Sequence, residues 1–168
     1  MEIPEVVTSY VDAFARVDVD ACADAFAPDG SYSDPGTAGP LSGQAIRDHF
    51  ATFLTGFPDA TCETVSLDPV TEHLSVWRWI LRGTNTGSYR GLPVTGRPLT
   101  LPGCEFIEAL GGKLHRIEGY FDRLTILGQL GLSPAPAAPS VCGIRAGRAL
   151  RALGQATTAS GSSHRQYP

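Results

Sequence analysis

The spacing of apolar side chains changes once along the chain, near residue 60, and this change restricts the fold more than any other feature. Residues 4–57 repeat apolar side chains three or four positions apart, as amphipathic helices do. Residues 61–122 instead alternate apolar and polar side chains, as half-buried strands do. Helices followed by consecutive strands predict an α+β fold with an antiparallel sheet, and they argue against a parallel dinucleotide-binding sheet.

Cap and turn residues predict where the elements begin and end. Asp18 can cap a second helix and Ser42 a third one, and Pro102-Gly103 indicates a bulge or a bend inside a strand. The expected helices cover residues 4–17, 19–27, 43–57 and 123–130. The expected strands cover residues 31–34, 61–70, 72–87, 98–110 and 113–122.

Composition divides the chain into an acidic body and a basic tail. All 17 acidic residues of the 168-residue chain lie within residues 1–122, and only basic charges follow. From Ser133 onward the sequence consists largely of Pro, Ala, Gly and Ser. We therefore expect one domain at residues 1–132 and a partly disordered basic tail at residues 133–168.

Several classes of protein do not fit this sequence. Acidic residues stand in Met1–Glu5, where a secretion signal needs basic ones, and no apolar run approaches the roughly 20 residues of a membrane span. Basic and aromatic residues are not interleaved as in nucleic-acid-binding proteins. The 4 His and 4 Cys show no metal-ligand spacing, and no glycine-rich dinucleotide motif follows a strand. We expect a cytoplasmic protein without a metal, a cofactor, a membrane or a nucleic-acid partner.

Three carboxyl groups are candidates for chemistry. Asp122 ends the last strand, and a cavity that excludes water would raise its pKa towards that of a useful general base. Asp122 also precedes a predicted helix and can cap it, which would lower the pKa. Asp34 is a second candidate acid or base, although Asp-Pro-Gly is also an ordinary turn. Glu105 stands between apolar neighbours, and strand alternation allows it to point inward.

Aromatic residues are numerous enough to line a cavity for a flat, hydrophobic small molecule, or simply to form the core. We expect the ligand to be contacted by Tyr120, Glu105, Trp79, Trp77, Tyr32, Phe14, Phe50 and His115. On the strand at residues 72–87, Trp77 and Trp79 share one face while Val76 and Ile80 share the other. Since both faces are apolar, one is expected to meet the helices and the other a second subunit, which predicts a homodimer.

Several short sequence words follow one another in an order that is typical of one family. They are Phe57-Pro58-Asp59, Gly83-Thr84-Asn85-Thr86-Gly87, Gly91-Leu92-Pro93-Val94-Thr95-Gly96-Arg97, Gly112-Lys113-Leu114, and Tyr120-Phe121-Asp122 with Gln129-Leu130-Gly131 seven residues on. Over about residues 3–132 the chain resembles the SnoaL-like polyketide cyclases of the nuclear-transport-factor-2-like superfamily. The resemblance implies a cone-shaped fold in which N-terminal helices pack on a bent antiparallel sheet and enclose a cavity.

The resemblance also implies a function. By this resemblance the chain is expected to be a cofactor-independent cyclase or isomerase of secondary metabolism, for instance in antibiotic biosynthesis. It would act on a hydrophobic intermediate by acid/base catalysis. The family's strand-borne Asp matches Asp122, with Tyr120 and Asp34 holding or polarising the substrate oxygen. Two positions depart from related patterns, because Asn85 stands where a His is usual and Gly119 where epoxide-hydrolase-like members have a second Asp. A non-catalytic binding protein of the same fold is the alternative, and an epoxide hydrolase or ether-forming cyclase is the third possibility.

Overall fold

The computed structural model describes residues 2–132, and the expected tail at residues 133–168 lies outside this range. The helices in this part of the chain are α1 (Glu5–Ala15), α2 (Val19–Asp24), α3 (Gln44–Gly56) and α4 (Arg123–Gln129). The strands are β1 (Phe26–Ser33), β2 (Thr61–Pro69), β3 (Leu74–Thr84), β4 (Pro98–Leu110) and β5 (Lys113–Phe121).

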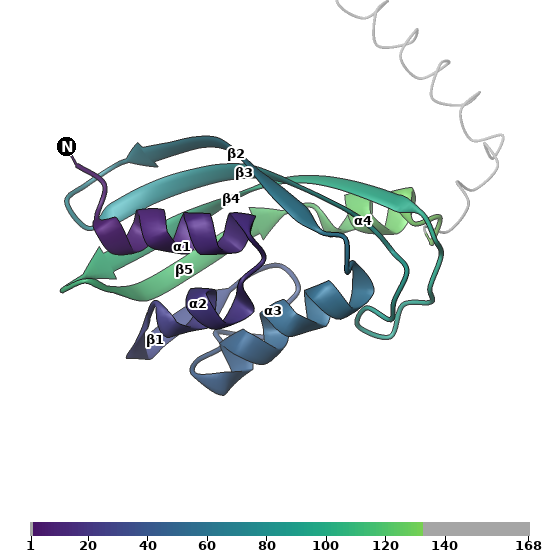
Figure 1. Ribbon diagram of the computed structural model, residues 1–168, viewed down its shortest axis with the longest axis horizontal. Coiled ribbons are helices and arrows are strands. Elements are labelled where there is room, and N and C mark those ends of the chain that lie inside the picture. The colour runs from purple at the N-terminus through teal and green to yellow at the C-terminus, as the bar shows by residue number, and fades with distance from the viewer. Residues whose placement is uncertain (1, 133–168) are drawn as a thin grey trace, which may run out of the picture. The chain divides into compact units, whose positions relative to one another are not determined.

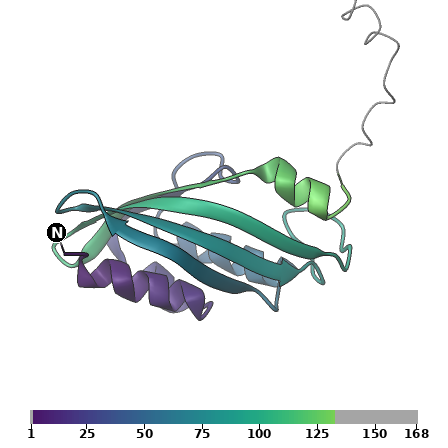
Figure 2. The ribbon, with the colours of Figure 1, turned by 90° about the horizontal axis from the view of Figure 1, so that it is seen from above.

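The strands form one sheet in the order β1-β5-β4-β3-β2. From β2 to β5, consecutive strands pair in antiparallel fashion, whereas β1 pairs in parallel with β5 at one edge. Figure 1 shows α1 crossing the long curved strands, with α2 and α3 below it, and α4 at the end of the sheet far from the N-terminus. Seen from above, α1 lies along one side of the curved sheet (Figure 2). The α+β arrangement predicted from the change of period is confirmed.

Strand alternation places the core on the side of the sheet that faces α1. Trp77, Trp79 and Leu81 of β3 are buried, whereas Arg78 and Arg82 on the opposite face are exposed. The same side of the sheet contributes fully buried side chains from β4 and β5, among them Ile107, Leu114 and Ile117. Because the side-chain period of a strand is two, these positions fix the register of the sheet.

Two predicted boundaries are wrong, because α2 ends at Asp24 rather than at Ala27 and β1 begins earlier than expected. β1 begins at Phe26 rather than at Ser31, because Phe26 pairs with Leu114 of β5 and the register shifts before Ser31. The irregular segment between them includes Gly30, where a Cβ atom would lie 2.7 Å from the Leu114 carbonyl oxygen. The strand therefore depends on a pairing partner and on a close backbone approach, neither of which appears in the local sequence pattern.

Two predicted local features also differ from the structure. The N-cap of α3 is Gly43, with a φ of 52°, and no side chain caps this helix, so the expected cap by Ser42 is wrong. At Pro102-Gly103 the pairing of β3 with β4 continues without a register shift. Gly103 is required there for another reason, because a Cβ atom would collide with the indole ring of Trp79. Asp18, by contrast, caps α2 as predicted, its carboxylate accepting the Ala21 N–H at 3.0 Å.

Among the described residues, no helix is both long enough and apolar enough to cross a membrane.

Candidate functional site

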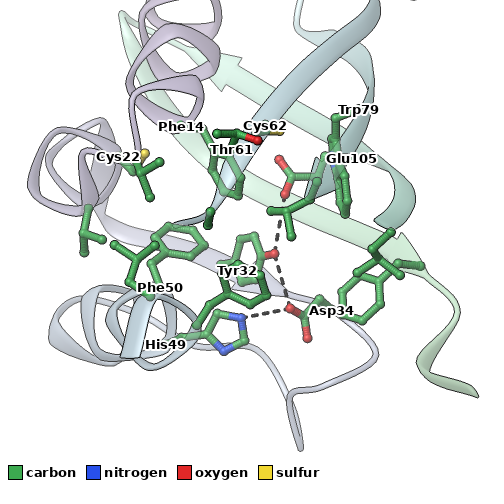
Figure 3. A pocket seen from close by; sticks show the side chains of 18 of the residues that line it. Phe14, Cys22, Tyr32, Asp34, His49, Phe50, Thr61, Cys62, Trp79 and Glu105 are labelled. Atoms are coloured by element: carbon green, nitrogen blue, oxygen red, sulfur yellow. Dashed lines mark hydrogen bonds and ion pairs between the residues drawn. The ribbon is translucent and has the colours of Figure 1, made fainter. Parts of the chain in front are cut away.

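A cavity of about 80 Å³ lies between the helices and the buried side of the sheet. Its wall is mostly apolar, and on one side of it Tyr32 lies between Glu105 and Asp34 (Figure 3). The residues that line it are Phe14, Val17, Val19, Cys22, Tyr32, Asp34, His49, Phe50, Phe53, Leu54, Ala60, Thr61, Cys62, Trp79, Leu81, Tyr89, Leu101, Glu105, Phe121 and Ile126.

Glu105 is the most deeply buried carboxyl group of this cavity. It occupies an inward position of β4, opposite Trp77 of β3, and its exposed fraction is 0%. Tyr10 donates a hydrogen bond to its Oε2 at 3.1 Å, and the Tyr32 hydroxyl lies 3.4 Å from its Oε1. Burial raises the pKa of Glu105 to about 8, and the hydrogen bond from Tyr10 only partly offsets this effect. At neutral pH Glu105 is therefore mostly protonated and can donate a hydrogen.

Asp34 is held at the end of β1 by a turn of its own. Its Oδ1 accepts the Gly36 N–H at 2.6 Å, and its Oδ2 lies 2.8 Å from Nε2 of His49. Burial by itself would raise the pKa of Asp34, but the hydrogen bond from His49, with help from Gly36 and Arg90, lowers it below its ordinary value. Asp34 is therefore ionised at neutral pH, although its side chain is only 5% exposed.

The orientation of His49 is fixed by a residue from a distant loop. Nη2 of Arg90 lies 2.7 Å from Nδ1 of His49, and since a guanidinium can only donate, Nδ1 accepts. The ring hydrogen is then on Nε2, from which it is donated to Asp34. Arg90 reaches this position from a tight turn in which both central residues, Arg90 and Gly91, have positive φ and Leu92 N–H bonds to the Tyr89 carbonyl at 2.8 Å. This is a type I′ turn.

Asn85 anchors the loop that carries this turn. Its side chain is fully buried, donates to the carbonyls of Gly56 and Gly87 at 3.4 and 3.0 Å, and accepts the Thr95 N–H at 2.9 Å. Asn85, which stands where the family usually has a His, thus holds the loop against the end of α3 by hydrogen bonds.

The cavity thus combines an acid and a base. Glu105 and Asp34 face the same apolar space, and their surroundings shift their pKa values in opposite directions, so one is protonated while the other is ionised. The two cysteines of the wall take no part as thiolates, because burial raises the pKa of Cys22 and of Cys62 to about 12. The arrangement can remove a proton from a carbon atom and supply one to an oxygen atom.

The structure brings most of the predicted site residues together. Six of the residues predicted from the sequence line the cavity, namely Asp34, Glu105, Trp79, Tyr32, Phe14 and Phe50. Trp77 is fully buried but belongs to the packed core, where its ring contacts those of Tyr10 and Phe14, and it is absent from the cavity wall.

The expected position of Asp122 in a dry cavity is wrong. Asp122 is exposed and caps α4, accepting the N–H groups of Leu124 and Thr125 at 2.9 and 3.1 Å and the Thr125 hydroxyl at 2.7 Å. The Thr125 hydroxyl bond and the Leu124 N–H bond lower the pKa of Asp122, which is the opposite of what a desolvated base requires. Strand alternation explains the difference. Phe121, the last residue of β5, lines the cavity, so the side chain of the next residue, Asp122, points away from it.

Tyr120 and His115 also lie outside the cavity wall, which corrects two further expectations. Tyr120 is 52% exposed on the outer side of the sheet, where its ring packs against Phe106. His115 is half-buried on β5 and contributes no side chain to the cavity.

Two polar residues of the site, Tyr10 and Arg90, were missed from the sequence, and His49 was not among the expected ligand contacts. Tyr10 belongs to the apolar stripe of α1 and has the pattern of a core residue. His49 lies off the centre of the α3 stripe, and Arg90 stands in a glycine-rich loop far along the chain. Only the position of His49 beside Phe50 on a buried helix face gave a local signal. The part of the chain that the structure describes contains no cluster of His, Cys, Asp and Glu able to hold a metal ion.

Comparison with known proteins gives a family and a fold. The family model of the SnoaL-like polyketide cyclases matches residues 4–130. None of the curated proteins compared with the chain matches it.

Solved structures share the fold at low sequence identity. AclR from Streptomyces galilaeus, a proposed hydroxylase, is 20% identical with a TM-score of 0.68, covering 92% of this chain and 96% of its own. IdmH from Streptomyces antibioticus, a proposed polyketide cyclase, is 26% identical with a TM-score of 0.64, covering 76% of this chain and 96% of its own. A Catenulispora acidiphila protein with a ketosteroid isomerase-like fold is 20% identical with a TM-score of 0.64, covering 80% of this chain and 100% of its own. The cone fold expected from the sequence words is therefore confirmed.

Proposed function

The chain belongs to the SnoaL-like polyketide cyclase family, and from this premise we propose that it is a cofactor-independent cyclase or isomerase. Its substrate would be a hydrophobic, polyketide-type intermediate of secondary metabolism. One observation carries the proposal: two carboxyl groups face the same apolar cavity, and their surroundings raise the pKa of Glu105 and lower that of Asp34. Catalysis of ring closure by aldol chemistry needs this combination, because a carbon must lose a proton while a carbonyl oxygen gains one.

Asp34 is the base in this proposal. Its carboxylate is oriented by His49, Gly36 and the Tyr32 hydroxyl, which occupy three of its four lone pairs and leave one free for the substrate. Glu105 is the acid, and it would donate its hydrogen to the carbonyl oxygen as negative charge develops there. The aromatic wall, including Phe14, Phe50 and Trp79, would hold a flat substrate between the two groups.

A keto-aldehyde that closes to an aromatic ring tests this proposal without knowledge of the natural substrate. The probe 2-(2-oxopropyl)benzaldehyde forms 2-naphthol and water by an intramolecular aldol condensation, and the fluorescence of 2-naphthol reports the rate. We expect Asp34→Asn and Glu105→Gln each to lower kcat by about 100-fold or more, the usual range for loss of a general acid or base. Affinity for the probe, followed by quenching of tryptophan emission, should change little because the apolar wall is intact.

Asp122→Asn is the matched control, since it alters a carboxyl group of the same domain that lies outside the cavity. We expect it to turn over the probe at the wild-type rate. Wild-type turnover by both cavity variants would contradict the proposal. Binding of the probe by the wild-type protein without any acceleration would instead favour the non-catalytic binding protein, which needs only the aromatic wall.

A further inference from the structure

The Tyr32 hydroxyl lies between the two carboxyl groups of the cavity. It is 3.4 Å from Oε1 of Glu105 and 3.3 Å from Oδ2 of Asp34 (Figure 3). Among the described residues, no other side chain hydrogen-bonds to both carboxyl groups. Tyr32 is buried, with 4% of its surface exposed, so bulk water does not compete for its hydroxyl group.

The number of available hydrogens shows how the three groups Glu105, Tyr32 and Asp34 are hydrogen-bonded. A tyrosine hydroxyl has one hydrogen and can donate to only one of two carboxyl groups. If both were ionised, the other carboxylate would face the lone pairs of the hydroxyl oxygen. Both contacts of the Tyr32 hydroxyl are hydrogen bonds when one carboxyl group is protonated and donates its hydrogen to the Tyr32 oxygen, while Tyr32 donates its own hydrogen to the other carboxyl group.

The neighbours of each carboxyl group decide which one carries the hydrogen. Asp34 receives N–H groups from His49 and Gly36, which favour the ionised form. Glu105 is fully buried and, among the described residues, forms no ion pair. The hydrogen therefore lies on Glu105, and the chain runs from Glu105 through Tyr32 to Asp34.

We infer that Tyr32 is a proton relay that returns the proton from Asp34 to Glu105 after each turnover. The inference rests on the proposed function, in which Asp34 takes a proton from substrate carbon and Glu105 gives one to substrate oxygen. Each ring closure then leaves Asp34 protonated and Glu105 ionised, and the later loss of water removes a carbon-bound hydrogen together with the hydroxyl group, so it changes neither carboxyl group. In the relay step, Asp34 Oδ2–H transfers its proton to the Tyr32 oxygen while the Tyr32 hydrogen passes to Glu105 Oε1. Atoms and charges balance, and neither water nor a cofactor is consumed.

The two relay distances are longer than the roughly 2.7–2.8 Å usual for O–H···O bonds. Catalytic hydrogen bonds are often long in the ligand-free state and shorten when the substrate is bound. The ring of Tyr32 packs edge-on against Phe50 and tilted against His49, with ring centroids 5.0 and 5.2 Å apart. These contacts keep the hydroxyl group between its two partners.

Tyr10 provides a matched control for this role. Like Tyr32, it is a buried tyrosine of the core whose hydroxyl hydrogen-bonds to Glu105, at 3.1 Å. Among the described residues, Glu105 is the only side chain to which this hydroxyl bonds. Tyr32→Phe and Tyr10→Phe therefore both remove one hydrogen bond to Glu105 and one oxygen atom from the core. Only Tyr32→Phe interrupts the path to Asp34.

The experiment compares the first turnover with later ones, using 2-(2-oxopropyl)benzaldehyde and rapid mixing. For Tyr32→Phe we expect a first turnover within about threefold of wild type, because acid and base start correctly protonated, followed by a steady state slower by about tenfold or more. The trace should show a burst of one 2-naphthol per protein molecule. Tyr10→Phe should show no burst, because it leaves the path to Asp34 intact and any slowing affects the first and the later turnovers equally. Thermal unfolding of both variants confirms that they fold.

Three outcomes separate this inference from the proposed function. If Tyr32→Phe and Tyr10→Phe have the same progress curves, the relay is wrong while the acid/base proposal stands. If Tyr32→Phe loses the first turnover as strongly as later ones, Tyr32 positions groups and relays nothing, which also overturns the inference. If Asp34→Asn and Glu105→Gln turn over at the wild-type rate, the proposed function fails and the relay with it.

Discussion

At the scale of single residues, burial determines which carboxyl group is an acid and which a base. Glu105 lies among apolar side chains with the hydroxyl groups of Tyr10 and Tyr32 as its hydrogen-bond partners, and a charge there would be poorly solvated. Asp34 is nearly as buried, yet it has N–H donors directed at its oxygens. The difference between these two carboxyl groups is thus one of hydrogen-bond partners more than of depth.

The buried Glu105 should make stability depend on pH. Its pKa is raised from 4.5 to about 8 on folding, so the folded state keeps a proton that the unfolded chain loses. Its contribution to stability is complete below the unfolded pKa and is lost as the pH rises to about 8, by at most about 1.4 kcal/mol per pH unit. We expect the free energy of unfolding of the wild type to fall from about pH 5 to pH 8 relative to that of Glu105→Gln, measured by urea unfolding. Parallel pH profiles would show that Glu105 is ionised in the fold.

Asp34 acts in the opposite direction on the acid side. Its pKa is lowered, so its contribution is present above the pKa of the unfolded chain and is lost as the pH falls through the folded value. Asp34→Asn should therefore flatten the acid limb of the same urea profiles. An unchanged acid limb would mean that His49 and Gly36 do not stabilise the carboxylate.

The cap at Asp122 gives a residue-scale prediction of its own. Asn caps helices about as well as Asp, whereas Ala does not. We expect Asp122→Ala to lower the Tm by a few degrees and Asp122→Asn to leave it nearly unchanged, with turnover of the probe retained in both. A loss of turnover in Asp122→Asn would restore Asp122 as a catalytic candidate.

At the scale of elements, the sequence predicts what is local and misses what depends on pairing. The strands β2 to β5 follow alternating patterns and are close to their predicted bounds, because alternation is a property of neighbouring residues. The first residues of β1 show no alternation, and their strand conformation comes from pairing with β5. Their extent is therefore a tertiary property.

The site follows the same rule. Glu105 was identifiable because a charged residue interrupts an apolar strand, and Asp34 because it ends one. Their hydrogen-bond partners come from α1, β1, α3 and the loop between β3 and β4, which meet only in the folded chain. Asp122 was misplaced because the same residue type suits a strand-end base and a helix cap, and only the geometry of α4 decides between them.

Gly103 of β4 supplies a prediction at this scale. A Cβ atom there would collide with the benzene part of the Trp79 indole, which forms part of the cavity wall. We expect Gly103→Ala to displace Trp79, shift its fluorescence emission, and lower the free energy of unfolding by about 1–3 kcal/mol. Gly39→Ala is the control, since no atom lies within 4 Å of its Cβ position. Equal stability of the two variants would mean that Trp79 can move without loss.

At the scale of the whole molecule, the outer side of the sheet lacks a partner within the described residues. Phe106 and Tyr120 are 39% and 52% exposed there, with ring centroids 5.7 Å apart. Charged residues of both signs surround them, including Arg116, which pairs with Glu108 at 2.5 Å, and Glu118. A surface with an apolar centre and both kinds of charge at its rim can be complementary to itself about a twofold axis. We propose that a second copy of the chain covers it.

Tyr120→Glu tests this pairing, because it places a negative charge at the apolar centre while leaving the cavity unchanged. We expect sedimentation to show a dimer for the wild type and a monomer for Tyr120→Glu at the same protein concentration. Val94→Glu is the control, since Val94 is a large apolar residue that is 58% exposed on the loop between β3 and β4, away from the sheet face. It should remain a dimer. A monomeric wild type, or a Tyr120→Glu variant that still dimerises, would contradict the proposal. The first turnover of the probe should be equal in monomer and dimer, because the described residues of a single chain already supply Glu105, Tyr32, Asp34 and His49.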